Sequence, residues 1–199
     1  MTIIRNFDNL NIYLNKLVDD VYEQPPDDGH TAWATEVFKK WFGGGRSMVK
    51  KVLDVGCGDT AFMKEMFESE CINYTGIALR TNHPDVINMD FTFLDFPDNS
   101  FDMIFSRHSL EHSPMPIISL MEWHRVSSAW LCLILPNPLA FGWTGRNHYS
   151  VLHPSQAEFL LDRAGWHIIW TDFTNPNELR YMCEKIRTSE YERSTGDTQ

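Results

Sequence analysis

Three titratable side chains stand close together in the stretch RHSLEHSP at positions 107–114, namely His108, Glu111 and His112. If this stretch forms a helical turn, residues three and four apart face one another, so His108 would lie near both of the others. An imidazole that titrates near neutral pH can take a proton from a hydroxyl, which makes His108 or His112 a candidate general base. In a simpler interpretation, Glu111 and His112 only shape the start of a helix.

The same residues also suit a metal ion, because divalent ions accept imidazole nitrogen and carboxylate oxygen as ligands. The downstream stretch RNHYSVLHP offers two further histidines, His148 and His153, which could complete such a set with His108, Glu111 and His112. The residue types alone leave three interpretations open: a base, a metal site and a purely structural turn.

A second stretch with possible chemistry, VLDVGCGDT at 52–60, places two glycines one residue apart after an apolar run. Gly56 and Gly58 allow backbone to approach a ligand, and the N-terminus of the helix expected next offers N–H groups to bind it. Ala61 replaces the last glycine of the dinucleotide fingerprint GxGxxG, and Asp54 precedes the first glycine by two residues. This asymmetry favours a nucleoside with a cationic side chain over a pyrophosphate, although two glycines also suit a plain tight turn.

The elements that must position these residues are visible from position 49 onward, where short apolar runs alternate with helical patterns. The expected strands read VKKVLDV, INYTGIAL, DVINM, FDMIFS, AWLCLILP, WHIIWTDF and LRYMCEKI. Such alternation predicts a doubly wound α/β fold, a mostly parallel sheet with helices on its faces. Ligands of such sheets bind at the carboxyl ends of the strands, which is where VLDVGCGDT and RHSLEHSP both fall.

The connection between INYTGIAL and DVINM departs from this pattern. Only about six residues, RTNHPD, join the two strands, whereas a parallel crossover normally needs a dozen or more. We expect the helix between these strands to be reduced or missing.

The chain divides into three parts. Apolar residues at helical spacing predict helices over about 9–23 and about 33–41, so 1–47 should form an N-terminal helical cap. The alternating pattern fills 48–188, and 189–199 form a polar tail. Two segments could cover the site: the cap, through Tyr13, Tyr22 and His30, and the glycine-bearing stretch FGWTGRNHY, which could act as a lid.

Composition narrows the possible partners. The net charge is −10. Because nucleic-acid affinity depends on Lys and Arg that displace counterions, this excess of acidic residues argues against a nucleic-acid partner. The longest apolar run, AWLCLILP, is too short to cross a bilayer. The four cysteines form no CxxC pair and read as reduced thiols. We therefore expect a soluble, cytoplasmic protein.

In combination, these stretches resemble the class I S-adenosylmethionine-dependent methyltransferases, especially their small type 11 group. VLDVGCG is similar to the motif DxGxG, and DFTFLDFPDNSFDMIFSRHSLEHSP is similar to the family's acidic residue, Leu-x-Phe-Pro-Asp-x-Ser-Phe-Asp, strand and Leu-Glu-His. LILPNP and HPSQAEFLLDRAGW resemble its fifth strand and the helix before its sixth. The resemblance covers roughly residues 48–187 and implies a Rossmann-like sheet of seven strands in the order 3-2-1-4-5-7-6, the last antiparallel.

The resemblance also implies a site for S-adenosylmethionine. It assigns Asp54, Gly56, Cys57 and Gly58 to the methionyl part, Asp90 and Phe91 to the adenine, and Ser106 to the amino group. The position whose acidic side chain binds the ribose hydroxyls carries Ala78, so we expect a bidentate contact worth about 1.5–3 kcal/mol to be lost. Arg80 would suit an added phosphate, as in NADP sites, but the missing third glycine speaks against that ligand.

The resemblance implies methyl transfer from S-adenosylmethionine. We expect the acceptor to be an oxygen or nitrogen of a small molecule, because the N-terminal cap is small, and His108 or His112 is the candidate base. The motif HxxEH at 108–112 also resembles the ExxEH pattern of ubiquinone-type and small-RNA 2′-O-methyltransferases. This resemblance makes four residues candidate metal ligands: His108, Glu111, His112 and His148. Two alternatives remain: a metal-dependent RNA 2′-O-methyltransferase, and a degenerate cofactor-binding fold acting as an interaction or regulatory subunit. The second is suggested by Ala78 and the short crossover.

Overall fold

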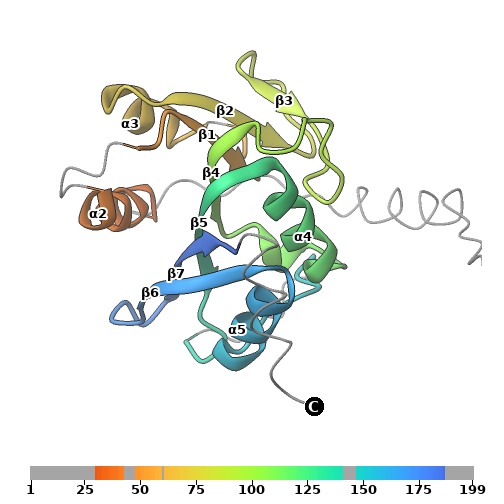
Figure 1. Cartoon of the computed structure of the whole chain (residues 1–199). Coiled ribbons are helices and arrows are strands. Elements are labelled where there is room, and N and C mark those ends of the chain that lie inside the picture. Colours follow the sequence, from red (N-terminus) through yellow and green to blue (C-terminus); the bar gives the residue numbers. More distant parts are fainter. Residues whose placement is uncertain (1–29, 43–47, 60, 141–146, 187–199) are drawn as a thin grey trace, which may run out of the picture.

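The structure, a computed structural model, describes residues 30–42, 48–59, 61–140 and 147–186 (Figure 1). Several expectations fall outside these ranges. They are the helix over about 9–23 with Tyr13 and Tyr22, most of the proposed lid FGWTGRNHY, and the polar tail. The helix expected over about 33–41 is present as α2 (His30–Phe42).

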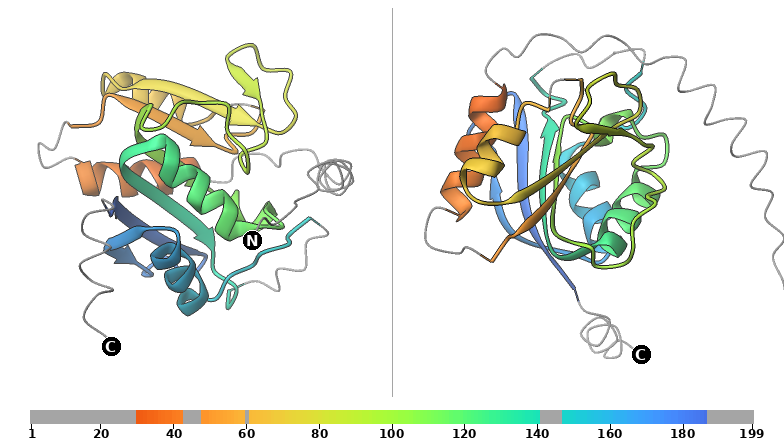
Figure 2. Two further views of the ribbon diagram at one scale, coloured as in Figure 1. Left: turned by 45° about the vertical axis from the view of Figure 1, so that its right-hand side comes forward. Right: turned by 90° about the horizontal axis from the view of Figure 1, so that it is seen from above.

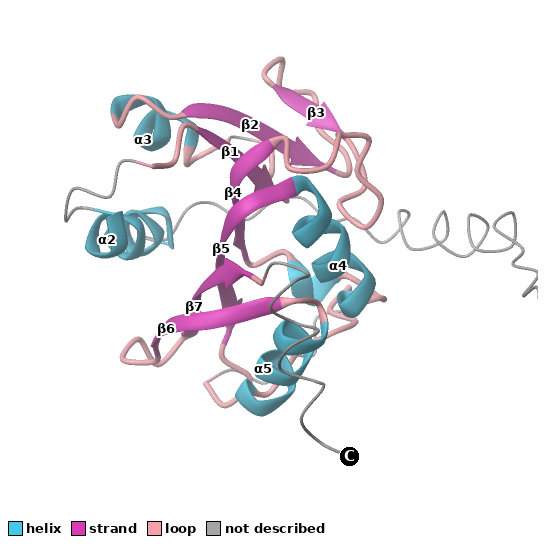
Figure 3. Ribbon diagram, viewed as in Figure 1, coloured by secondary structure: helices cyan, strands magenta, loops and turns pink. Residues whose placement is uncertain are grey.

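Seven strands form one sheet in the order β3-β2-β1-β4-β5-β7-β6 (Figure 3). Their bounds are β1 (Lys51–Val55), β2 (Asn73–Ala78), β3 (Val86–Asn88), β4 (Phe101–Arg107), β5 (Ser127–Pro136), β6 (Trp166–Asp172) and β7 (Glu178–Lys185). All pairs from β3 to β5 are parallel, and β7 runs antiparallel to both β5 and β6. The strand order and the single antiparallel strand confirm the predicted fold class.

Helices cover both faces of this sheet (Figure 2). On one face lie α2 and the short α3 (Lys64–Ser69), and on the other lie α4 (Pro116–Val126) and α5 (Pro154–Arg163). A 3-10 turn, η1 (Leu110–His112), follows β4. The molecule therefore has the layered arrangement that alternating strand and helix patterns predict.

The central strand β5 shows why the sheet is covered twice. Its alternate side chains enter two separate cores: Leu131 and Leu133 pack into the core beside α4 and α5, whereas Cys132 and Ile134 pack into the core beside α2 and α3. An uninterrupted apolar run is what a strand buried on both faces requires. The prediction made from AWLCLILP is confirmed.

The crossover from β2 to β3 has no helix, as expected from its length. The turn is closed instead by Asn88, whose carboxamide accepts from Thr81 N at 2.8 Å and donates to Thr81 O at 3.1 Å. Residues 89–100, between β3 and β4, also form no helix. The sequence did not single out this second departure.

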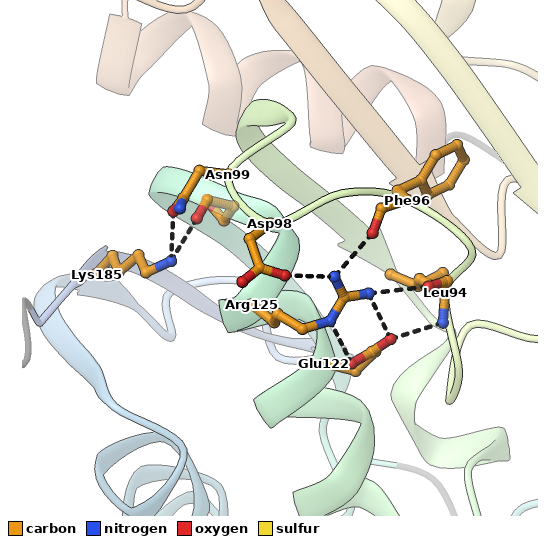
Figure 4. A network of polar contacts seen from close by, with 8 residues as sticks. Leu94, Phe96, Asp98, Asn99, Glu122, Arg125 and Lys185 are labelled. Atoms are coloured by element: carbon orange, nitrogen blue, oxygen red, sulfur yellow. Dashed lines mark hydrogen bonds and ion pairs between the residues drawn. The ribbon is translucent and has the colours of Figure 1, made fainter.

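The loop between β3 and β4 is held by cationic side chains from neighbouring elements (Figure 4). Arg125 of α4 donates to the carbonyl oxygens of Phe96 at 2.7 Å and Leu94 at 2.9 Å. It also contacts Asp98 at 2.8 Å. These contacts, rather than a helix, fix the segment that leads to β4.

Candidate functional site

The glycine loop after β1 is pressed against the segment that follows β4. Gly56 and Gly58 have φ of +74° and +70°, a conformation that glycine adopts without strain. The N–H groups of Gly56 and Cys57 both donate to Ile77 O, at 2.9 and 3.0 Å. A Cβ added at Gly56 would lie 2.3 Å from Ser109 Oγ. Glycine at 56 is therefore required by the close approach of two loops.

The helix after this loop begins later than expected. Its first residue is Lys64, and residues 61–63 form turns. The expected contact between the N-terminus of this helix and a ligand stays a prediction.

Asp54 is buried below the loop and has a partner inside the protein. Tyr74 Oη donates to Asp54 Oδ2 at 2.8 Å. Burial raises the pKa of Asp54 to about 7, although the bond from Tyr74 and the charge of Arg107 act to lower it. The contact needs Gly76, because a Cβ there would lie 2.7 Å from Tyr74 Oη. Sequence reasoning missed Tyr74; the only signal was the tyrosine two residues before a strand glycine.

The expected ribose position is apolar. Ala78 is buried in a small cluster with Cys57, Ala61 and Val86. The thiol of Cys57 belongs to this cluster, where burial raises its pKa far above the ordinary value. Asn88, the strand partner of Ala78, uses both ends of its carboxamide on Thr81. The side chain at 78 thus supplies no acid, and the nearby amide does not replace it.

The remaining expected cofactor residues lie on the same edge of the sheet. Asp90 follows β3 and accepts from Thr92 N at 2.8 Å. Phe91 packs edge-on against Trp123, with ring centroids 5.6 Å apart. Ser106 in β4 pairs with the last residue of β1 and is fully buried. Among the described residues its Oγ has no hydrogen-bond partner.

At the end of β4, His108 faces a buried carboxylate. Its backbone has φ of +50°, uncommon for a residue other than glycine, and its N–H donates to Ile134 O at 2.9 Å. Its Nε2 lies 3.4 Å from Glu178 Oε1, at the start of β7. Arg180 Nε donates to the other carboxylate oxygen of Glu178 at 2.8 Å.

Glu178 stays ionised in this setting. Burial alone would raise the pKa of Glu178, but the facing His108 and Arg180 outweigh burial and hold the pKa below its ordinary value. A fixed carboxylate beside the ring orients the imidazole of His108. Sequence reasoning missed Glu178, because it opens an antiparallel strand and meets His108 only through the pairing of β7 with β5.

Glu111, His112 and His148 form a second group. Helical spacing suggested that His108 would lie near Glu111 and His112, and the charge of His108 does act on both residues. The turn η1 begins only at Leu110, however, and His108 Nε2 lies 3.4 Å from Glu178 Oε1. His148 approaches from the coil after β5, with its ring centroid 4.7 Å from that of His112. One ligand atom from each of the three residues lies within 4.8 Å of the others.

Burial dominates the titration of this group. Glu111 is 1% exposed, and burial raises its pKa to about 7, although the charge of His108 acts to lower it. Burial lowers the pKa of His112 to about 4 and also lowers that of His148. His153, the other histidine considered, lies at the start of α5, where its N–H donates to Gln156 Oε1 at 3.0 Å. It is not part of the group.

The strand order, with a glycine loop after β1, defines the class I methyltransferase fold. Residues 53–129 match the family model described as a methyltransferase domain, and the chain is similar in this region to S-adenosylmethionine-dependent methyltransferases. A curated relative, cycloartenol-C-24-methyltransferase 1 of Oryza sativa subsp. japonica, is 26% identical over 116 residues. This alignment covers 50% of the chain and 32% of the rice protein, so the chain spans about a third of the length of that relative.

Solved structures share the fold at low identity. The 1,6-didemethyltoxoflavin-N1-methyltransferase of Burkholderia thailandensis, with S-adenosylhomocysteine bound, superposes with a TM-score of 0.69 at 13% identity, covering 94% of this chain and 93% of its own. Another similar structure is a chain from the complex of the Haloferax volcanii Trm112 methyltransferase activator with a methyltransferase. It superposes with a TM-score of 0.61 at 15% identity, covering 82% of this chain and 100% of its own. Within the described residues, no helix has the length and apolar content that a membrane crossing requires.

Proposed function

We propose that this protein binds S-adenosylmethionine at the glycine loop and catalyses methyl transfer to an oxygen or nitrogen of a small molecule. The observation that carries the proposal is the contact between Gly56 and Ser109. It sets His108, one residue before Ser109, beside the loop that would hold the cofactor. A cofactor loop and a candidate base therefore share one corner of the sheet.

The residues on the carboxyl edge fit most of this cofactor. Gly56 and Gly58 have positive φ and carry no side chain, so the backbone of the loop can contact a ligand at the carboxyl edge of the sheet. Asp90 follows β3 on the same edge. Bound S-adenosylmethionine would supply a methyl group on a sulfonium, and the acceptor would take that methyl group as its bond to sulfur breaks and S-adenosylhomocysteine leaves, without a covalent enzyme intermediate. Because Ala78 offers no carboxylate to the ribose, we expect affinity in the micromolar range or weaker.

His108 is the better of the two candidate bases. Its Nε2 lies 3.4 Å from Glu178 Oε1, and a carboxylate at this distance would stabilise the imidazolium that forms when the ring takes a proton from the acceptor. His112 is less suited, because its Nδ1 contacts Asn147 O at 3.1 Å and its pKa is lowered to about 4 by burial. A base with so low a pKa drives proton transfer weakly.

A small-molecule acceptor agrees with the net charge of −10 and with the relatives. The rice protein is named for cycloartenol, and the Burkholderia enzyme was solved with 1,6-didemethyltoxoflavin. A cytoplasmic location agrees with the four free cysteines. RNA methylation is the weaker proposal, since the acidic balance opposes phosphate binding.

A regulatory subunit is the second candidate, and the apolar surroundings of Ala78 favour it. The Haloferax complex pairs an activator with a methyltransferase, and this second candidate gives the present chain a protein partner as well. Such a subunit would bind a protein and leave S-adenosylmethionine unbound.

Titration calorimetry of the purified chain separates the two candidates. S-adenosylmethionine and S-adenosylhomocysteine are the ligands, and NADP is the control for a site that prefers a pyrophosphate. We expect both sulfur ligands to bind with one-to-one stoichiometry and NADP to give no heat. No binding of either sulfur ligand up to millimolar concentration would overturn the proposed function and favour the regulatory subunit.

A further inference from the structure

We propose that Glu111, His112 and His148 bind a divalent transition-metal ion of the zinc type. The three residues come from two segments, the turn η1 after β4 and the coil after β5. Their potential ligand atoms lie within 4.8 Å of one another. This site is separate from the glycine loop and does not depend on the proposed cofactor.

The donor set selects the class of ion. Two imidazole nitrogens and one carboxylate oxygen suit zinc and its first-row neighbours, whereas magnesium and calcium prefer oxygen ligands alone. Three protein ligands leave a fourth position of a tetrahedral ion for water or another small ligand.

His112 is already oriented as a metal ligand. Its Nδ1 lies 3.1 Å from Asn147 O, and if this contact is a donated hydrogen bond, the lone pair is on Nε2. Metal-bound histidines commonly donate their second ring nitrogen to a carbonyl in this way, which fixes the tautomer and the ring.

Glu111 provides the independent sign of a missing partner. Its carboxyl is 1% exposed, and within the described part of the chain its Oε2 has no hydrogen-bond partner. An uncompensated buried carboxyl costs free energy, and proteins usually pair such a group or place it on a metal. A dication between Glu111 and the two rings would bind the carboxylate oxygen that has no hydrogen-bond partner in the described part of the chain.

Only a small adjustment would close the site. Zinc bonds of about 2.0–2.1 Å place tetrahedral ligand atoms about 3.4 Å apart, so the group must contract by roughly an ångström. The coil is already attached to η1, because Tyr149 N and Ser150 N donate to Glu111 O at 2.8 and 2.9 Å. His148 is only partly buried and is the ligand that can move.

The test is a titration of chelator-treated wild-type protein with ZnCl₂ in the absence of S-adenosylmethionine. We expect one equivalent to bind, and Co²⁺ used as a probe should give the visible absorption of a tetrahedral site. Glu111→Gln and His148→Ala should each weaken zinc binding at least tenfold. His167→Ala, which removes an exposed histidine on β6, is the matched control and should bind like wild type.

Circular dichroism checks that each variant folds. Glu111→Gln is almost isosteric and His148 is partly exposed, so a folded variant is available even if one of them fails. Binding no tighter than millimolar by the wild type would overturn the metal site, as would a folded His148→Ala that binds as tightly as wild type. Neither result would bear on cofactor binding, which is measured in a separate titration.

Discussion

The carboxyl edge of the sheet differs between its two ends. At what we term the nucleoside end, the ends of β2 and β3, Ala78 packs among apolar side chains and Asn88 is occupied by backbone. At the histidine end, formed by residues after β4, the coil after β5 and the start of β7, five titratable side chains gather: His108, Glu111, His112, His148 and Glu178.

This difference indicates that the titratable side chains needed for catalysis lie at the histidine end and not at the nucleoside end. At the nucleoside end, the carboxamide of Asn88 is exposed and makes its hydrogen bonds to the backbone of Thr81. At the histidine end, a buried acid remains without a full set of partners in the described part of the chain. The contrast favours an enzyme with modest cofactor affinity over a fold that has lost all function.

The strongest test breaks the junction between the two ends. Gly56→Ala places a Cβ against Ser109 at a positive φ, so we expect loss of detectable S-adenosylmethionine binding and a loss of about 1–3 kcal/mol in stability. Gly165→Ala is the matched control, since Gly165 also has a positive φ, +89°, at the end of α5. Equal cofactor affinity in both variants would remove the loop from the site.

The second test removes the base from the histidine end. His108→Ala should slow methyl transfer by about 10²–10⁴-fold while cofactor affinity stays unchanged, because the ring acts on the acceptor. Glu178→Gln should slow transfer less and shift the pH dependence, since it only orients His108. Radiolabelled transfer to an acceptor selected from phenols and amines provides the rate, and His167→Ala is the control. Unchanged turnover in His108→Ala would make that histidine structural.

The third test measures the cost of burying Glu111. Its pKa is about 7 when folded and 4.5 in its ordinary state, so the folded form holds an extra proton between these values and loses stability as pH rises through this window. In the presence of chelator, the free energy of unfolding of Glu111→Gln should exceed that of the wild type by about 3 kcal/mol at pH 8, and by much less at pH 4. Urea unfolding at both pH values provides the comparison. A difference independent of pH would show that Glu111 is not strained by burial.

The smallest expected effect comes from a substitution that adds a carboxylate at the nucleoside end. Ala78→Asp places a carboxylate at the ribose position and should tighten S-adenosylmethionine binding about 10- to 100-fold, at some cost in stability. In Ala78→Asn the side chain has the size of aspartate without its charge, so the affinity for S-adenosylmethionine should increase less. If calorimetry finds both variants no tighter than wild type, Ala78 does not face the ribose.

Much of the fold was accessible from local pattern. The apolar run AWLCLILP predicted a central strand, and the short RTNHPD predicted a crossover without a helix, because both depend on nearby residues. The glycine loop and the end of β4 were correctly placed on one edge, because parallel strands align their carboxyl ends.

What escaped prediction depends on contacts between distant segments. Glu178 reaches His108 only through the antiparallel pairing of β7, and Tyr74 reaches Asp54 only because Gly76 leaves room. Helical spacing predicted one turn through His108, Glu111 and His112, but His108 has a positive φ and lies before η1, so it is not part of that turn. Local periodicity contains no information on such turns.

The most direct test of the account is a nuclear magnetic resonance titration of ¹⁵N-labelled protein with S-adenosylhomocysteine. We expect amide shift changes concentrated at Gly56, Gly58, Ala78 and Ser106, with little change along β6. Shifts confined to other segments, or none at millimolar ligand, would contradict the central claim that the glycine loop and the end of β4 form one cofactor site.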